Sequence, residues 1–147
     1  TFSDSFIVNV FRDPLERAVR EADLVFCNEF EAQAYAQTGD ALEAFRALHS
    51  SIPNVAMTLG AAGSRLHIAG RDFEIPSYPT TVLNTNGAGD MYAGAFLYGM
   101  THGLGAETAG RLASYASSLV VAQHGARLNG SHTDVRDYIL RQSANKN

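Results

Sequence analysis

Residues 84–90 read Asn84-Thr85-Asn86-Gly87-Ala88-Gly89-Asp90 and lead into a stretch of small and apolar residues that runs from Met91 to about His102. That stretch predicts a helix, so the glycines stand at its N-terminus. Backbone N–H groups at a helix start have no acceptor inside the helix, and the helix dipole adds partial positive charge. This turn can therefore hold an anion, with Asp90 beside it. A tight glycine turn followed by a first-turn aspartate is the other interpretation, and spacing alone leaves both open.

Strand and helix patterns alternate on both sides of this turn. Short β-rich or apolar runs predict strands at 5–10, 24–27 and 55–59, and alternating residues around Gly70-Arg71 predict a hairpin over 65–75. Capping residues and apolar spacing predict helices after Pro14, from Asn28 to about Gln37, and over 41–49, 106–123 and 131–140. The alternation predicts an α/β layered fold with a mostly parallel sheet flanked by helices. The run at 5–10 reads as a strand from the middle of a sheet, so we expect more chain to precede it.

Composition narrows the class of protein. The 147 residues suffice for one domain with a core, and 46% hydrophobic and 18% charged residues are ordinary for a globular protein. A net charge of -4 gives no reason to expect nucleic acid or an anionic membrane as a partner. The first residues lack the features of a signal peptide, and the single cysteine, Cys27, reads as a buried thiol. These features predict a cytoplasmic location.

Four stretches occur in an order typical of one enzyme family. Residues 84–97 resemble the C-terminal signature of the ribokinase-like (PfkB-type) carbohydrate and nucleoside kinases. Residues 28–31 resemble the N-x-x-E motif of these kinases, residues 58–64 their T-x-G-x-x-G turn, and residues 115–126 the helix that borders the adenine. The resemblance implies a ribokinase-like fold in which residues 1–147 form the C-terminal nucleotide-binding and catalytic portion. The N-terminal half and the β-sheet lid of such kinases have no counterpart here.

The resemblance also implies a role for individual residues. Asp90 would be the general base, and Gly87, Ala88 and Gly89 the anion hole. The nucleotide would be lined by Thr58, Gly60, Gly63, Asn86 and Ser114, and Mg²⁺ would be organised through water by Asn28 and Glu31. ATP and Mg²⁺ are therefore the expected cofactors. Asn84 stands where many members of the family carry Asp, which leaves a requirement for a monovalent cation open.

Elementary chemistry supports some of these roles and offers alternatives. Mg²⁺ prefers carboxylate and water oxygens, and Asn28 and Glu31 are one helical turn apart. The same two residues also form the pattern of a helix capping box, and both interpretations can hold together. Gly60 and Gly63 equally fit a simple turn. No pair among the five histidines has zinc-ligand spacing, so solvated or capping roles are expected for most of them.

The sequence thus predicts an ATP-dependent phosphotransferase that acts on a primary alcohol of a sugar or nucleoside, similar to adenosine kinases, with this chain inactive alone. A hydroxymethylpyrimidine or pyridoxal-type kinase and a non-catalytic nucleotide-binding or dimerisation module of the same fold are the alternatives. A dinucleotide-binding redox domain is disfavoured, because the third glycine of G-x-G-x-x-G is missing and Asp90 would face the pyrophosphate. The expected partners are a small-molecule acceptor and a second copy in a homodimer, without nucleic acid or membrane.

Overall fold

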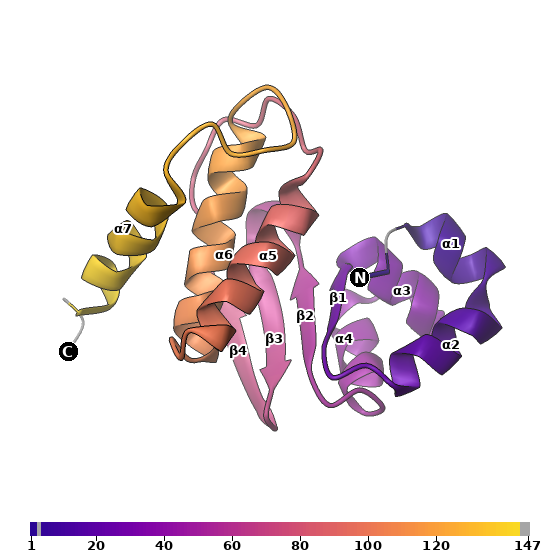
Figure 1. Ribbon diagram of the computed structural model, residues 1–147. Helices are drawn as coiled ribbons and strands as arrows, with labels where there is room; N and C mark the ends of the chain where they lie inside the picture. The colour runs from indigo at the N-terminus through magenta and orange to yellow at the C-terminus, as the bar shows by residue number, and fades with distance from the viewer. Residues whose placement is uncertain (3, 145–147) are drawn as a thin grey trace. The chain divides into compact units, whose positions relative to one another are not determined.

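The computed structural model describes residues 1–2 and 4–144, which divide into two compact units (Figure 1). The N-terminal unit comprises Thr1–Gly60 and Ser64–Glu74. The C-terminal unit comprises Ala61–Gly63 and the chain from Ile75 onward. Among the described residues, no helix combines the length and the apolar character needed to cross a membrane.

The sheet has four strands in the order β1-β2-β3-β4, namely β1 (Val25–Asn28), β2 (Val55–Thr58), β3 (Ser64–Ile68) and β4 (Arg71–Ile75). β1 and β2 are parallel, whereas β2 and β3 are antiparallel. The α/β class predicted from the sequence is confirmed. The sequence predicted a mostly parallel sheet, but within the described residues parallel pairing is limited to β1 and β2. The reason is that β3 and β4 form a hairpin, and β3 pairs antiparallel with β2.

Four helices belong to the N-terminal unit: α1 (Ser5–Val10), α2 (Arg12–Arg20), α3 (Glu29–Ala36) and α4 (Ala41–His49). α4 has the predicted bounds because Asp40 caps it, accepting a hydrogen bond from the N–H of Glu43 at 2.7 Å. Its apolar stripe, Phe45 and Leu48, is buried with Val55 and Met57 in the core of this unit. The helices α3 and α4 thus cover the paired strands β1 and β2.

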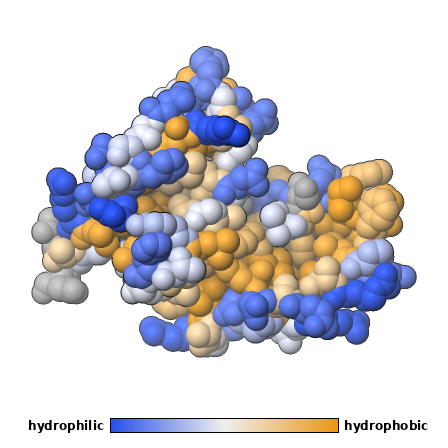
Figure 2. Space-filling view, viewed as in Figure 1, coloured by the Kyte–Doolittle hydropathy of each residue, from blue (hydrophilic) through white to orange (hydrophobic). Residues whose placement is uncertain are grey.

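The prediction of a strand at 5–10 was wrong. Asp4 caps a helix there, because its carboxylate accepts from the N–H of Phe6 at 2.6 Å. Phe6, Val8 and Val10 alternate as in a strand, but the capping signal from Asp4 prevails and only Val8 is buried. The other apolar side chains of α1 are exposed, Phe6 by 65% and Val10 by 55%, and the apolar colour over α1 is visible in Figure 2.

The C-terminal unit contains α5 (Ala88–Thr101), α6 (Ala106–Val121) and α7 (His132–Ala144), together with the short 3-10 turn Gly60–Ala62 at its border. α5 and α6 pack closely, because a Cβ on Gly99 would lie 2.7 Å from the Cβ of Ala109. α7 begins as predicted after Ser131, whose hydroxyl accepts from the N–H of Asp134 at 3.3 Å. Helix–helix packing therefore builds this unit around the apolar faces of α5 and α6.

Three element boundaries differ from the predictions by a few residues. Gln37 itself adopts a left-handed conformation (φ 56°) and ends α3 before Gly39 is reached. α6 ends at Val121 with Ala122 as its C-cap, before Gly125. The hairpin turn is Ala69-Gly70, with φ of 51° and 74°, and not Gly70-Arg71. Two positive φ values in succession are typical of the two-residue hairpin turn whose twist matches that of the strands.

Candidate functional site

The glycine turn before α5 contains two glycines with different surroundings. Gly87 is the N-cap of α5 with a left-handed φ of 78°, and a Cβ there would meet the carbonyl oxygen of Ala126 and lie 2.8 Å from its Cβ. Gly89 has no positive φ, and nothing lies within 4 Å of a Cβ built on it. The fold therefore requires glycine at position 87, whereas at position 89 the glycine leaves space open in front of the helix start.

The N–H groups of this turn are partly used. Ala88 donates to the carbonyl of Thr85 at 3.2 Å, and Met91 donates to the carbonyl of Gly87 at 2.9 Å. The N–H groups of Gly89 and Asp90 have no acceptor among the described residues, as expected in the first turn of a helix. Asp90 is exposed. The turn thus brings together a carboxylate, two available N–H groups and open space.

The segment that enters the turn is held by its backbone. The N–H groups of Leu83 and Asn84 both donate to the carbonyl of Val121, at 2.7 and 3.2 Å. The side-chain oxygen of Asn84 accepts from the N–H of Asn86 at 2.9 Å, which forms a local turn. The carboxamide of Asn84 therefore has a structural role, although its oxygen keeps a second lone pair.

Asn28 and Glu31 form the capping box of α3. The N–H of Glu31 donates to Oδ1 of Asn28 at 2.9 Å, and the N–H of Asn28 donates to Oε2 of Glu31 at 3.0 Å. Nδ2 of Asn28 also donates to Oε1 of Glu31 at 2.9 Å, so both carboxylate oxygens have donors. Burial raises the pKa of the Glu31 carboxyl above its usual value, although the backbone hydrogen bond from Asn28 acts in the opposite direction.

Thr58 lies next to this box. It is the last residue of β2 and pairs with Asn28, the last residue of β1, so the carboxyl ends of the two parallel strands bring them side by side. The hydroxyl of Thr58 is 3.5 Å from the carbonyl oxygen of Cys27. Carboxyl ends of parallel strands are where α/β proteins commonly bind ligands. The N-terminal unit thus places Asn28, Glu31 and Thr58 close together.

The remaining predicted residues of the nucleotide site differ in their constraints. Gly63 has φ 93°, and a Cβ there would meet the backbone of Ile75 and Ser77, so the fold requires this glycine. Gly60 also has a positive φ, 55°, but nothing lies within 4 Å of its Cβ position. Ser114 is buried on α6, and its hydroxyl donates to the carbonyl of Pro76 at 2.8 Å. The hydroxyl of Ser114 therefore orders the chain around Pro76.

Two groups of side chains were not found from the sequence. His49, His67 and Asp72 meet in the N-terminal unit, although their spacing resembles no metal motif. In the C-terminal unit a cavity of about 190 Å³ is lined by Pro76, Ser77, Tyr78, Arg111, Tyr138, Ile139, Gln142 and Ser143. Burial raises the pKa of the Tyr78 phenol there. Each group combines residues from segments that are distant in the chain, so no local sequence pattern indicates it.

The parallel strands β1 and β2, and the helix α5 that starts at a glycine turn beside a carboxylate, agree with the ribokinase-like fold that the sequence predicts. Similarity to solved structures of such kinases confirms this fold. The sequence profile of the pfkB family of carbohydrate kinases matches residues 1–134, and the chain belongs to this family.

Individual relatives agree with this membership. Adenosine kinase 1 of Arabidopsis thaliana is 30% identical over an alignment of 138 positions, and the match covers 84% of this chain and 40% of that protein. The crystal structure of adenosine kinase from Sinorhizobium meliloti is 32% identical with a TM-score of 0.86, and the match covers 96% of this chain and 43% of that one. A ribokinase-like structure from Escherichia coli in complex with ATP and Mg²⁺ shares the fold at 21% identity, with a TM-score of 0.80 over 94% of this chain and 46% of that one. The chain thus spans less than half the length of these relatives.

Proposed function

We propose that this chain is the C-terminal portion of a kinase that transfers the γ-phosphate of ATP to a primary alcohol of a nucleoside or sugar, and that it belongs to the adenosine-kinase-like branch. The observation that carries the proposal is the glycine turn before α5: an exposed Asp90, available N–H groups and open space at Gly89 lie together at a helix N-terminus. Similarity to two adenosine kinases supports the choice of branch.

In the proposed mechanism each group of the turn has one task. Asp90 accepts the proton of the attacking hydroxyl, which makes the acceptor oxygen a better nucleophile. The N–H groups of Gly89 and Asp90, with the dipole of α5, stabilise charge on the transferring phosphoryl group. Ala88 contributes through backbone geometry, because its N–H already donates to Thr85.

The nucleotide side of the site is proposed on residues that lie elsewhere in the chain. Thr58, Gly60 and Gly63 would line the path of ATP, and Asn86 and Ser114 would border it. Bound Mg²⁺ would shield the phosphate charges, held through water by the box of Asn28 and Glu31, whose oxygens retain free lone pairs. A carboxyl group in a capping box suits an indirect role through water, because direct ligation would compete with its hydrogen bonds.

The test uses the full-length protein with the substitution Asp90→Asn, which keeps the shape of the side chain and removes the base. We expect kcat to fall about 10²- to 10⁴-fold while the affinity for ATP changes little. Asp134→Asn is the matched control, because Asp134 is also an exposed acid in the first turn of a helix. Equal turnover of the Asp90→Asn variant and the wild type would remove Asp90 from its role.

A second test addresses the extent of the chain. Because acceptor binding and lid closure in the family rest on the part of the kinase that this chain does not match, we expect the isolated chain to release almost no ADP with adenosine, other nucleosides, ribose or fructose. Robust ADP release by residues 1–147 alone would contradict the proposed division of the domain. The same substrate panel, extended to hydroxymethylpyrimidine and pyridoxal, applied to the full-length protein identifies the acceptor.

The non-catalytic module is the alternative from a different class. It would bind ATP without turnover in the full-length protein, and the intact carboxylate of Asp90 disfavours it. The predicted homodimer, the cytoplasmic location and the response to monovalent cations stay predictions. Sedimentation of the full-length protein tests the first, and kinase assays with and without K⁺ test the last.

A further inference from the structure

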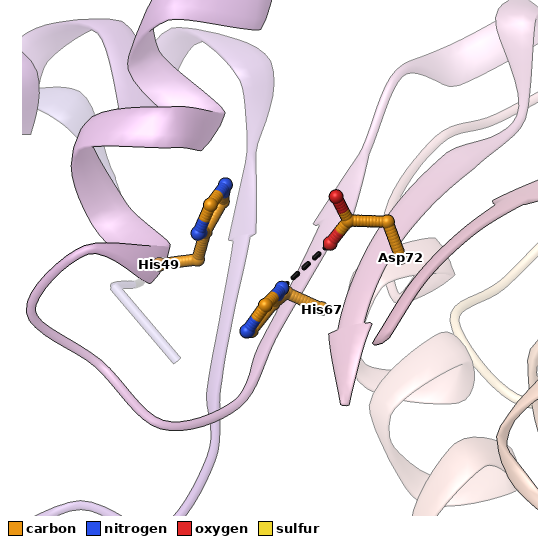
Figure 3. A group of neighbouring side chains, drawn as sticks. All are labelled: His49, His67 and Asp72. Atoms are coloured by element: carbon orange, nitrogen blue, oxygen red, sulfur yellow. Dashed lines mark hydrogen bonds and ion pairs between the residues drawn. The ribbon is translucent and has the colours of Figure 1, made fainter. Parts of the chain in front are cut away.

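His49, His67 and Asp72 form a compact group in the N-terminal unit (Figure 3). They come from three different elements, the end of α4, β3 and β4. One potential ligand atom from each side chain lies within 4.8 Å of the other two. We propose that these three side chains bind a divalent late transition-metal ion, with Zn²⁺ as the expected occupant, at a site separate from the proposed Mg²⁺ position.

The hairpin places two of the three ligands. The two-residue turn Ala69-Gly70 sets His67 of β3 opposite Asp72 of β4, and Nδ1 of His67 lies 2.6 Å from Oδ1 of Asp72. The turn itself is anchored, because the N–H of Ala69 donates to Oδ1 of Asn54 at 2.8 Å. The hairpin therefore fixes the positions of the His67 imidazole and the Asp72 carboxylate relative to each other before any metal binds.

The third ligand comes from the last residue of α4. The ring of His49 stacks on that of His67 with centroids 4.4 Å apart and planes 11° from parallel. It also makes an edge contact with the buried ring of Phe45, with centroids 5.2 Å apart. These two ring contacts restrict the rotamers of His49, which lowers the entropy lost when a metal binds. The C-terminus of α4 also carries partial negative charge, which favours a cation.

The donor set matches zinc chemistry. Two neutral imidazoles and one carboxylate are ligands found in zinc sites with three protein ligands and an open fourth position. Metal–ligand distances of about 2.0–2.2 Å in a tetrahedron put donor atoms about 3.3 Å apart. The donor atoms lie within 4.8 Å of one another, so the widest separation must shrink by at most about 1.5 Å. The 2.6 Å contact between Nδ1 of His67 and Oδ1 of Asp72 must widen if both atoms bind the metal, and the two rings must tilt so that their in-plane lone pairs converge. The side chain of Asp72 is 65% exposed and free to make this adjustment, whereas that of His67 is only 17% exposed.

An ordinary hydrogen bond between His67 and Asp72, with a stacked His49, is the competing explanation, and it predicts no metal affinity. The two explanations are separated by titrating the metal-free chain with ZnCl₂ at neutral pH, using calorimetry and a competing chromophoric chelator. We expect saturable binding of one Zn²⁺ per chain and no comparable binding of Mg²⁺, because imidazole suits late transition metals.

Variants locate the site. His49→Ala and Asp72→Asn should each weaken Zn²⁺ binding at least about ten-fold, since each removes one of three ligands. His132→Ala is the matched control, because His132 is an exposed histidine at the start of α7, and it should leave binding unchanged. If circular dichroism shows that His49→Ala does not fold, Zn²⁺ binding by Asp72→Asn tests the proposal, because the side chain of Asp72 is exposed.

A structural readout completes the test. The X-ray absorption spectrum of the zinc-loaded chain should show two imidazoles in the first coordination shell, and loading should raise the melting temperature of the wild type but not of Asp72→Asn. Absence of saturable Zn²⁺ binding, or equal binding by the wild type and both ligand variants, would overturn the proposal. None of these measurements depends on kinase activity, so their failure leaves the proposed function untouched.

Discussion

The two glycines of the turn before α5 predict opposite effects for the same substitution. In Gly87→Ala, an alanine must adopt φ 78°, which costs about 1–2 kcal/mol. Its Cβ would also lie 2.8 Å from the Cβ of Ala126, and displacing that backbone costs about 1–3 kcal/mol. The sum, about 2–5 kcal/mol, is large against the stability of a unit of this size.

Gly89→Ala should do the reverse. Gly89 is in the first turn of α5, has no positive φ and has nothing within 4 Å of a Cβ. Replacing glycine by alanine within a helix then stabilises by about 0.5–1 kcal/mol. The added methyl group would, however, occupy the space proposed for the phosphoryl group. In the full-length protein we expect kcat to fall about 10²- to 10³-fold, as when one donor of an anion hole is lost.

Two assays on the same pair of variants check this reasoning. Thermal unfolding, followed by circular dichroism, should show a melting temperature lowered by about 8 °C or more for Gly87→Ala and unchanged or raised for Gly89→Ala. ADP release by the full-length protein should fall about 10²- to 10³-fold in Gly89→Ala although its fold is intact. A Gly87→Ala variant as stable as the wild type would refute the packing argument, and an active Gly89→Ala variant would refute the anion hole.

Two further predictions concern the N-terminal unit. Burial raises the pKa of Glu31 in the folded state above its ordinary 4.5, so the stability that this group contributes is fully present below pH 4.5 and is lost as pH rises through the folded-state pKa. In urea unfolding from pH 4 to 7, the wild type should therefore lose stability relative to Glu31→Gln. A gain in the relative stability of the wild type with rising pH would contradict this sign. Cys27 is buried, and burial raises the pKa of its thiol. We therefore expect a thiol reagent to modify Cys27 at least about 100-fold faster in urea than in buffer. Fast modification of the folded chain would show instead that β1 opens readily.

Much of the fold could be predicted because its signals are local. The helix after Asn28 follows from a capping pattern within four residues, and the bounds of α4 follow from a cap and a regular apolar stripe. The segment at 5–10 was misread because alternating apolar residues favour a strand, while a single cap at Asp4 favours a helix. Antiparallel pairing of β2 and β3 was not predicted either, because strand direction depends on a connection and not on the strands.

The candidate site divides in the same way. Asp90 and its glycines are contiguous, and Asn28 and Glu31 are one helical turn apart, so a short pattern describes each group. The cluster of His49, His67 and Asp72 forms because a hairpin and the end of a helix meet in the fold. The spacing of these residues in the sequence does not predict it. Ser114 is intermediate: its position in the helix was predicted, but the partner of its hydroxyl, Pro76, lies 38 residues away.

The geometry of the glycine turn separates what folding requires from what a ligand would require. In the sequence, Gly87 and Gly89 are equivalent members of one motif. In the structure, conformation and the contact with Ala126 fully account for Gly87, so its presence would be needed even in a protein that binds nothing. Neither constraint applies to Gly89, and alanine would suit that helix position better. The fold does not need Gly89, which lies beside an exposed carboxylate and available N–H groups. An anion-binding role explains a glycine at this position, whereas a purely structural turn does not explain it.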